Sequence, residues 1–292
     1  EGKYPVVIKA DGLALGKGVL ICQNEQEAAD GVKEIMLDKK FGASGNHVVV
    51  EEFLTGPEVS VLSFCDGKTV KPMVSSMDHK RALDHDEGLN TGGMGTVAPN
   101  PYYTPAVAER CMQEIFLPTV AAMQAEGCPF KGCLYFGLML TPDGPKVIEY
   151  NCRFGDPETQ VVLPLLESDL LTVMEATTNG TLDKTDVKFS DGAAACVILA
   201  SGGYPLAYEK GKEITGLTAG QLDAADVTVY HAGTAIKDGS LVTNGGRVLG
   251  VTATANTLPE ALKKAYAATE SIHFDKLHKR SDIGARALAA MQ

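Results

Sequence analysis

The chain has 292 residues, of which 45% are hydrophobic and 22% charged, an ordinary composition for a globular protein. This length exceeds what one compact core usually holds, so two domains are the starting expectation. Its net charge of −11 argues against a surface for duplex nucleic acid or for an anionic membrane. No apolar run approaches the roughly 20 residues that span a bilayer, and we expect neither nucleic acid nor a membrane as a partner.

The first section is predicted to alternate strands with one helix. Strands are expected at residues 6–10, 19–22 and 48–54. Asn24 can cap a helix over about 25–39, and Glu27, three residues on, completes a capping pattern. The chain starts with Glu1 rather than Met and enters a strand almost at once, which indicates a fragment that begins inside a fold.

Two hairpins are predicted in the next section. The paired strands and their turns are residues 58–65 and 69–75 around Asp66-Gly67, and residues 133–141 and 146–151 around Pro142-Asp143-Gly144. Between the hairpins we expect a glycine-rich loop over 86–101 and a helix over 105–126, where apolar residues recur at helical spacing. Helices at about 159–167 and 169–179 close the section.

The polar, turn-rich stretch 179–191 predicts a domain boundary. Beyond it, strands are expected at residues 193–200, 228–232, 241–243 and 248–253. A capped helix from Thr257 to Ser271 follows them, so this part should form a smaller α+β domain.

Seven cysteines are scattered through the chain, and no pair has the C-x-x-C spacing of a zinc or redox site. Several lie in apolar runs, where a free thiol behaves as a small core residue. A reduced cytoplasm is therefore the expected compartment.

Lys9 ends the first predicted strand, and the loop behind it is rich in glycine and lysine. Gly12, Gly16, Lys17 and Gly18 offer backbone N–H groups, a second ammonium group and room for close approach. This composition suits a loop that folds over polyphosphate, although the spacing is not that of a Walker A loop. A glycine-rich hairpin with solvated lysines explains the same residues equally well.

The stretch 51–58 combines carboxylates with an apolar pair and a Gly-Pro break. Taken alone, surface carboxylates at a strand end are the better-supported interpretation. The functional alternative is a hinge whose backbone groups contact an adenine edge, with one carboxylate accepting the ribose hydroxyls.

A third motif spans residues 149–158. Residues two apart on a strand share a face, so Glu149, Asn151 and Arg153 should project together. Two hard oxygen ligands suit Mg²⁺ bridging nucleotide phosphates, and the guanidinium could neutralise charge on a transferred phosphoryl group. A structural salt-bridge cluster is the alternative, but an Asn beside two charges in an apolar hairpin favours a site.

The fourth motif joins the charged run 78–81 to the glycine-rich run 90–95. Following a strand and preceding glycines, the charged run is a candidate anion site; a solvated charge run is the alternative. His79 alone could equally be a hydrogen-bonded scaffold residue.

In this order and spacing, the motifs resemble the glycinamide ribonucleotide synthetase family. The matching strings are VVIKADGLALGKGV, VVVEEFLTGPEVS, DHKRALDHDEGLNTGGMG, YFGLML, VIEYNCRFGDPETQ, ASGGYP, HAGT, TNGGRVLGVTA and KRSDIG. The resemblance covers essentially the whole chain. DHKR with NTGGMG, and NCRFGDPETQ, are specific to the family, whereas the lysine loop and EEFL indicate only the wider ATP-grasp superfamily.

The resemblance implies an α+β chain with an ATP-grasp fold. The lid subdomain would cover residues 1–54, the central subdomain with the metal and substrate site 55–190, and a small α+β carboxy-terminal domain 191–292. It also implies a C–N ligase of purine biosynthesis that joins glycine to 5-phosphoribosylamine, through a glycyl phosphate, with ATP and Mg²⁺ or Mn²⁺. The enzyme should be a cytoplasmic monomer or weak dimer.

Roles carry over position by position. Lys9 and Lys17 match the phosphate-holding lysines of the lid, within the loop that contains Gly12, Gly16 and Gly18. The nucleotide and metal positions are Glu51, Phe53 and Leu54 in the adenine hinge, Glu58 as the ribose acid, Glu149 and Asn151 as metal ligands, and Arg153 facing the transferred phosphoryl group. The acceptor pocket is assigned to Asp78, Lys80, Arg81, Asn90, Thr91, Gly92, Gly93 and Asp156.

The chain also departs from the pattern. Many ATP-grasp enzymes place a further acidic metal ligand where this chain has Leu138-Met139-Leu140, so the metal should rely on water and phosphate oxygens. The family has an amino-terminal Rossmann-like domain that helps bind the phosphoribosyl group, and we expect this chain to lack it, as well as the later-pathway domains of fused enzymes. Another ATP-grasp carboxylate–amine ligase, or a nucleotide-binding fragment inactive without that domain, stays open as an alternative.

Overall fold

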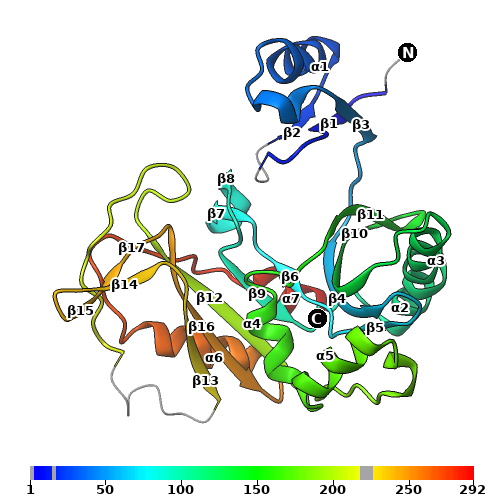
Figure 1. The fold of residues 1–292 in the computed structure, drawn as a ribbon. Coiled ribbons are helices and arrows are strands. Elements are labelled where there is room, and N and C mark those ends of the chain that lie inside the picture. The colour runs from blue at the N-terminus through cyan, green and yellow to red at the C-terminus, as the bar shows by residue number, and fades with distance from the viewer. Residues whose placement is uncertain (1–2, 15–17, 218–225) are drawn as a thin grey trace. The chain divides into compact units, whose positions relative to one another are not determined.

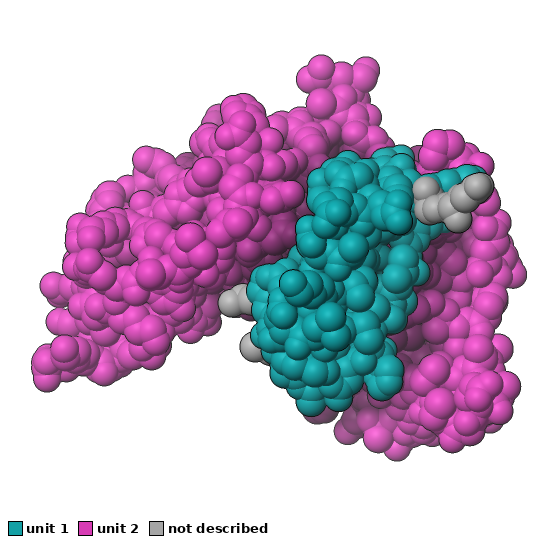
Figure 2. All heavy atoms as spheres, turned by 90° about the horizontal axis from the view of Figure 1, so that it is seen from above, with its two compact units in different colours: residues 1–56 teal, residues 57–292 magenta. Residues whose placement is uncertain are grey.

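The structure is a computed structural model that describes residues 3–14, 18–217 and 226–292 (Figure 1). The predicted sites Gly16 and Lys17 lie outside the described residues. The chain divides into two compact units, Glu1–Gly56 and Pro57–Gln292 (Figure 2). In the described ranges, no helix has the length and apolar character needed to cross a membrane.

The first unit is a three-stranded antiparallel sheet with helical cover on one face. The strand order is β2-β1-β3, with bounds β1 Val6–Ala10, β2 Val19–Cys22 and β3 Val48–Glu52. Helix α1 (Glu25–Val32) continues as a π-helical segment, Lys33–Leu37, and the sheet and helices enclose a small core around Ile8, Cys22 and Ile35. The predicted Asn24 cap is confirmed, because Asn24 Oδ1 accepts from Glu27 N–H. Glu27 completes the pattern one residue earlier than in a capping box, since its Oε2 accepts from Gln23 N–H.

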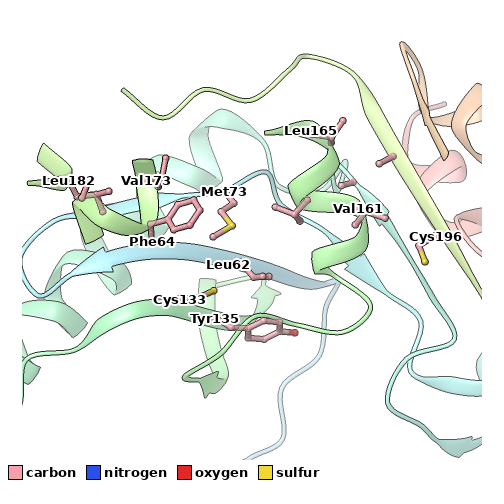
Figure 3. Close-up of a cluster of buried hydrophobic side chains, with 14 of the residues drawn as sticks. Leu62, Phe64, Met73, Cys133, Tyr135, Val161, Leu165, Val173, Leu182 and Cys196 are labelled. Atoms are coloured by element: carbon pink, nitrogen blue, oxygen red, sulfur yellow. The ribbon is translucent and has the colours of Figure 1, made fainter. Parts of the chain in front are cut away.

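The second unit contains a four-stranded antiparallel sheet built from the two predicted hairpins. The order is β11-β10-β4-β5, with bounds β4 Glu58–Asp66, β5 Val70–Pro72, β10 Lys131–Thr141 and β11 Gly144–Asn151. One face packs against a continuous helical stretch that confirms the predicted helix: α2 Pro105–Cys111, a π-helical segment Met112–Phe116 and α3 Leu117–Ala125. The other face packs against α5 (Leu170–Asn179), and Figure 3 shows Leu62, Phe64 and Val173 in the buried cluster there.

A larger antiparallel sheet joins strands from both sides of the predicted boundary 179–191. Its order is β13-β16-β12-β9-β6, with β17 also pairing β12; the bounds are β6 Met77–Asp78, β9 Gly95–Ala98, β12 Ala193–Ser201, β13 Val227–His231, β16 Arg247–Ala255 and β17 Leu277–His278. Helix α6 (Leu258–Thr269) covers one face. Short helix α4 (Thr159–Val162) packs on the other face, next to Cys196. The proposed division into subdomains stays a prediction.

Several expected elements differ from the structure. The loop expected over 86–101 is wrong, because it contains strands β8 (Glu87–Asn90) and β9, and β8 pairs with β7 (Arg81–Leu83). The helix expected over 159–167 is shorter, since α4 gives way to a 3₁₀ turn at Leu163–Leu165. Thr257 stands at the N-cap of α6, but its side chain makes no capping hydrogen bond.

The remaining described elements are small. The strand expected at 241–243 belongs to a separate hairpin of β14 and β15, and a short helix, α7, lies near the end of the chain; their bounds are β14 Thr234–Lys237, β15 Ser240–Thr243 and α7 Ala285–Ala290.

Candidate functional site

One face of the four-stranded sheet changes from apolar to polar along its strands. Antiparallel pairing places Asn151 opposite Tyr135, and Glu149 opposite Gly137. Glu149 and Asn151 therefore share a face, as their spacing predicts. Gly137 leaves the room that the Glu149 side chain occupies, because a Cβ at Gly137 would lie 2.8 Å from Glu149 Cγ.

The oxygen atoms on this face fit a hard divalent cation. Asn151 Nδ2 donates to Glu149 Oε1 at 3.4 Å, so the amide and the carboxylate lie side by side. Mg²⁺ is typically bound by one or two protein carboxylates together with water and substrate phosphates. No group of three or more His, Cys, Asp or Glu residues able to hold a metal occurs among the described residues. The donor set thus suits a cation that arrives with a polyphosphate.

Glu158 is a buried carboxyl group on the same side of the sheet. Its Oε1 accepts from Tyr135 Oη at 3.0 Å, and the hydroxyl groups of Tyr135 and Ser60 lie 2.7 Å apart. Burial raises the pKa of Glu158, although the bond from Tyr135 opposes the shift. Burial and the neighbouring Glu158 carboxylate raise the pKa of Asp78 well above its usual range. Burial therefore favours the protonated form of both acids relative to exposed carboxyl groups.

Lys80 lies among acidic side chains. Its Nζ forms an ion pair with Glu58 Oε2 at 3.0 Å. Burial lowers the pKa of Lys80, but Glu58, Glu149 and Asp78 outweigh that effect and raise it above its usual value. Lys80 is therefore a permanent cation next to the predicted ribose acid and the predicted metal ligands.

Arg153 follows the predicted metal ligands at the end of β11. Its Nη1 donates to the carbonyl of Phe154 at 2.9 Å, and its side chain is exposed. Its charge acts on Glu158 by lowering the pKa of that acid, against the larger effect of burial. The structure therefore brings Glu58, Asp78, Lys80, Glu149 and Arg153 into one electrostatic neighbourhood.

His79 is a scaffold residue in the structure. Its Nδ1 lies 3.1 Å from the carbonyl of Gly95, and its Nε2 accepts from Gly284 N–H at 3.0 Å. Burial, with Arg280 and Arg286 nearby, lowers the pKa of His79 to about 4. A neutral imidazole with both nitrogens engaged is not available for proton transfer, which favours the scaffold interpretation of the sequence.

The predicted acceptor residues form a second group, held mainly by backbone contacts. Thr91 donates through both its N–H and its Oγ1 to the carbonyl of Lys80, and Gly93 N–H donates to Thr91 Oγ1. Gly93 has φ of +114°, and a Cβ there would lie 2.7 Å from Asp78 Oδ1. Arg81 pairs with Asn90 across β7 and β8.

Two further residues at this group were not singled out from the sequence. Arg247 donates to Asp156 and to the carbonyl of Gly92, and Tyr204 Oη accepts from Gly92 N–H. Arg247 is 155 positions from Gly92. Its sequence signal is its place in the string TNGGRVLGVTA, which matches the family but did not point to this contact.

The first unit carries the remaining predicted nucleotide residues. Lys9 pairs with Glu51 at 2.5 Å, on the sheet face opposite the core. Cross-strand pairing places exposed Val19, Ile21 and Val49 on the same face, so apolar surface lies beside this ion pair. Such a surface suits a flat purine ring with a phosphate chain.

The glycines of the predicted lid have packing roles of their own. Gly12 N–H donates to the carbonyl of Ser44 at 3.0 Å, and a Cβ at Gly12 would lie 2.5 Å from Ser44 Cα. The carbonyl of Gly18 accepts from Ala10 N–H at 2.8 Å. Phe53 and Leu54 follow β3 within the same unit. Nucleotide contacts by these residues stay predictions.

Comparison with known proteins gives matches along nearly the whole chain. Residues 1–159 match the family model "Phosphoribosylglycinamide synthetase, ATP-grasp (A) domain", and residues 194–286 match "Phosphoribosylglycinamide synthetase, C domain". The phosphoribosylamine–glycine ligase of Vibrio vulnificus is 49% identical over 293 residues, covering 100% of this chain and 68% of that protein. The trifunctional purine biosynthetic protein adenosine-3 of Gallus gallus is 51% identical over 97% of this chain and 28% of its own length.

Solved structures agree with these matches. The crystal structure of phosphoribosylamine–glycine ligase from Thermotoga maritima superimposes with a TM-score of 0.86 at 41% identity, covering 96% of this chain and 68% of that chain. The biotin carboxylase domain of Hydrogenobacter thermophilus 2-oxoglutarate carboxylase reaches a TM-score of 0.70 at 15% identity, covering 99% of this chain and 61% of that chain. The second similarity shows a shared fold alone.

Proposed function

This chain belongs to the phosphoribosylamine–glycine ligase family, and we propose that it carries the chemistry by which glycine and 5-phosphoribosylamine are joined with the consumption of ATP. The products would be glycinamide ribonucleotide, ADP and phosphate. The observation that supports this most directly is the shared face of Glu149 and Asn151, next to Lys80 and Arg153.

We propose a reaction in two steps. A carboxylate oxygen of glycine attacks the γ-phosphorus of ATP, the bond to ADP breaks, and glycyl phosphate forms. The amine of phosphoribosylamine then attacks the carbonyl carbon, phosphate leaves, and the amine loses a proton. In the first step, Arg153 would face the transferred phosphoryl group and neutralise the charge that develops on its oxygens.

Glu149 and Asn151 are the residues that would hold Mg²⁺ or Mn²⁺. A divalent cation at this position would supply charge neutralisation between the nucleotide phosphates. Lys9 and Lys17 would hold the phosphates from the lid, and Glu51, Phe53 and Leu54 would contact adenine. Glu58, whose Oε2 also pairs with Lys80 Nζ, would accept the ribose hydroxyls.

The acceptor-side roles are proposals as well. The residues that would line the pocket for glycine and phosphoribosylamine are Asp78, Lys80, Arg81, Asn90, Thr91, Gly92, Gly93 and Asp156. We further propose a monomer or weak dimer located in the cytoplasm, where the seven free cysteines would remain reduced.

The test is Glu149→Gln in the complete gene product. Loss of one anionic oxygen ligand should weaken Mg²⁺-dependent ATP binding and nearly abolish ADP release with glycine and freshly made phosphoribosylamine. Glu175→Gln, an exposed change on α5, is the matched control and should retain wild-type turnover. Near wild-type turnover by the Glu149 variant would contradict the metal assignment. A wild-type enzyme that releases ADP with a different carboxylate but not with glycine would contradict the proposed reaction.

A further inference from the structure

Two side chains from beyond residue 190 hold the backbone of Gly92. Gly92 donates its N–H to Tyr204 Oη at 2.9 Å, and its carbonyl accepts from Arg247 Nη1 at 2.8 Å. A Cβ at Gly92 would lie 2.9 Å from Arg247 Cζ, so the absence of a side chain allows the guanidinium to lie against this residue. Both backbone polar groups of Gly92 are thus fixed by residues distant in the sequence.

The same guanidinium also holds the other acceptor segment. Arg247 Nη1 donates to the carbonyl of Asp156 at 2.7 Å, and Nη2 lies 3.1 Å from Asp156 Oδ2. The second carboxylate oxygen, Oδ1, accepts from Gln160 Nε2 at 2.8 Å. The Asp156 side chain remains about half exposed, at 53%, while that of Arg247 is 20% exposed. The Asp156 carboxylate is therefore oriented by Arg247 and Gln160 and remains accessible to a ligand.

Local backbone geometry places Arg247 and Tyr204 next to each other. Arg247 begins β16, where the pairing with β12 shifts register between Leu199 and Ala200. Ser201 N–H donates to the carbonyl of Gly246 at 2.7 Å, which brings the end of β12 against the residue before Arg247. The Tyr204 ring occupies the space beside Gly246, where a Cβ would lie 2.2 Å from Tyr204 Cδ2.

We propose that Arg247, assisted by Tyr204, is a positioning residue that sets the distance between the Gly92 backbone and the Asp156 carboxylate for binding of the phosphoribosylamine acceptor. This inference rests on the proposed ligase function. A planar guanidinium holds three acceptors at once, and an ammonium group does not reproduce that geometry. In the described part of the chain, the Arg247 side chain hydrogen-bonds Gly92 and Asp156, not Glu149, Asn151 or Arg153.

The placement predicts a separation of kinetic effects. A displacement of about 1 Å in a positioning group can cost on the order of 10²-fold in rate. Loss of Arg247 should therefore raise KM for phosphoribosylamine roughly 10-fold or more while KM for ATP changes less than about 2-fold. A residue that only stabilised the fold would lower the amount of active enzyme and leave both KM values unchanged.

The experiment compares Arg247→Lys, Arg247→Ala and Tyr204→Phe in the complete gene product, with Arg110→Lys as a matched control. Arg110 forms a two-point contact with Glu114 on the exposed side of α2, so its change should alter neither KM. Added guanidinium should partly restore the activity of the Arg247→Ala variant. The Gly92 amide, which is hydrogen-bonded to Tyr204 in the wild type, should undergo faster hydrogen exchange in the substrate-free variants. Tyr204→Phe should produce the smaller kinetic change of the same kind.

Each result has a distinct meaning. A KM increase confined to phosphoribosylamine, with rescue by guanidinium, supports the positioning role. Equal changes in both KM values, or a loss of activity that only follows a loss of thermal stability, would overturn it. A wild-type enzyme that makes no glycinamide ribonucleotide would instead overturn the proposed function and, with it, this kinetic role. Unchanged hydrogen exchange of the Gly92 amide in the variants would separately contradict the proposal that Arg247 and Tyr204 hold the Gly92 backbone.

Discussion

Arg153 is the residue whose replacement should separate phosphoryl transfer from nucleotide binding. Arg153→Lys keeps the positive charge but loses the planar fork that can contact two oxygens at once. We expect kcat to fall on the order of 10²-fold or more, while ATP affinity changes far less. Single-turnover kinetics and titration with a non-hydrolysable ATP analogue measure the two quantities. A fall in affinity at constant kcat would make Arg153 a ground-state binding residue.

At the residue scale, the sequence identified positions that lie within one strand or one turn. Glu149 and Asn151 could be predicted to share a face because side chains alternate along a strand. Arg247 could not be predicted as a partner of Asp156, because that contact depends on the packing of β16 against a loop 91 positions away. The scaffold role of His79 also required the structure, since Gly284 is 205 positions away.

At the element scale, the pairing of β10 with β11 makes room for the proposed metal site. Gly137→Ala would place a Cβ 2.8 Å from Glu149 Cγ and displace that side chain. We expect a raised Mg²⁺ requirement for ATP turnover, measured by metal titration. Gly250→Ala is the control in β16, where the added Cβ would meet Cys196 Sγ at 3.2 Å, away from the metal ligands. It should affect stability without changing the Mg²⁺ requirement; the same metal effect in both variants would contradict the prediction.

The link between β6 and α7 through His79 predicts a pH dependence of stability. The folded-state pKa of His79 is about 4, below the unfolded value of about 6.5, because burial and the charges of Arg280 and Arg286 outweigh the carbonyl of Gly95 and Asp86. The unfolded chain therefore binds the proton more readily, and stability should fall as pH drops from about 6.5 to 4.

The full contribution of His79 to this loss is on the order of 3 kcal/mol, from a difference of about 2.5 pKa units. Urea unfolding at pH 7.5 and at pH 4.5 measures it. His79→Asn should be less stable at pH 7.5 because its contacts are altered, but it should lose less further stability on acidification. An equal acid-induced loss in both proteins would show that other groups cause the dependence.

Helices and strands with a local sequence signal could be predicted, whereas strands that depend on partners distant in the sequence could not. The hairpin of β10 and β11 has its turn sequence beside it, and the helical stretch 105–125 has its own periodicity. Strands β7 and β8 are short and flank a turn with His85 and Asp86 at positive φ. Their pairing depends on contacts from the end of the chain, which no local signal in residues 86–101 indicates.

At the scale of the whole molecule, the sheet around β12 joins strands from both sides of the predicted boundary near residue 190. Strands β6 and β9 precede that position, and β12 and β16 follow it, yet each pairs with its neighbour in one sheet: β6 with β9, β9 with β12, and β12 with β16. The polar composition of residues 179–191 indicates an exposed connection, and a domain boundary there stays a prediction. We therefore expect the acceptor segments and the carboxy-terminal strands to unfold together.

Arg280 provides the test of that coupling. Its side chain is 1% exposed and forms a two-point contact with Asp282. It also donates to Asp86 Oδ1 at 3.0 Å and to the carbonyl of Arg81 at 3.1 Å. Arg280 therefore connects the hairpin of β7 and β8 to the end of the chain. Arg280→Lys leaves part of this buried network unpaired and should cost about 3–5 kcal/mol of unfolding free energy.

Arg286→Lys is the matched control, because Arg286 contacts the same Asp86 at 3.3 Å but is 56% exposed, and its replacement should cost no more than about 0.5 kcal/mol. Urea unfolding gives both values, and hydrogen exchange should show faster opening in residues 81–90 and 193–201 together in the Arg280 variant. Faster exchange confined to 81–90 would mean that the hairpin opens alone. In that case the predicted acceptor residues Arg81 and Asn90 would be coupled to the carboxy-terminal strands only locally, and the expectation of joint unfolding would be wrong.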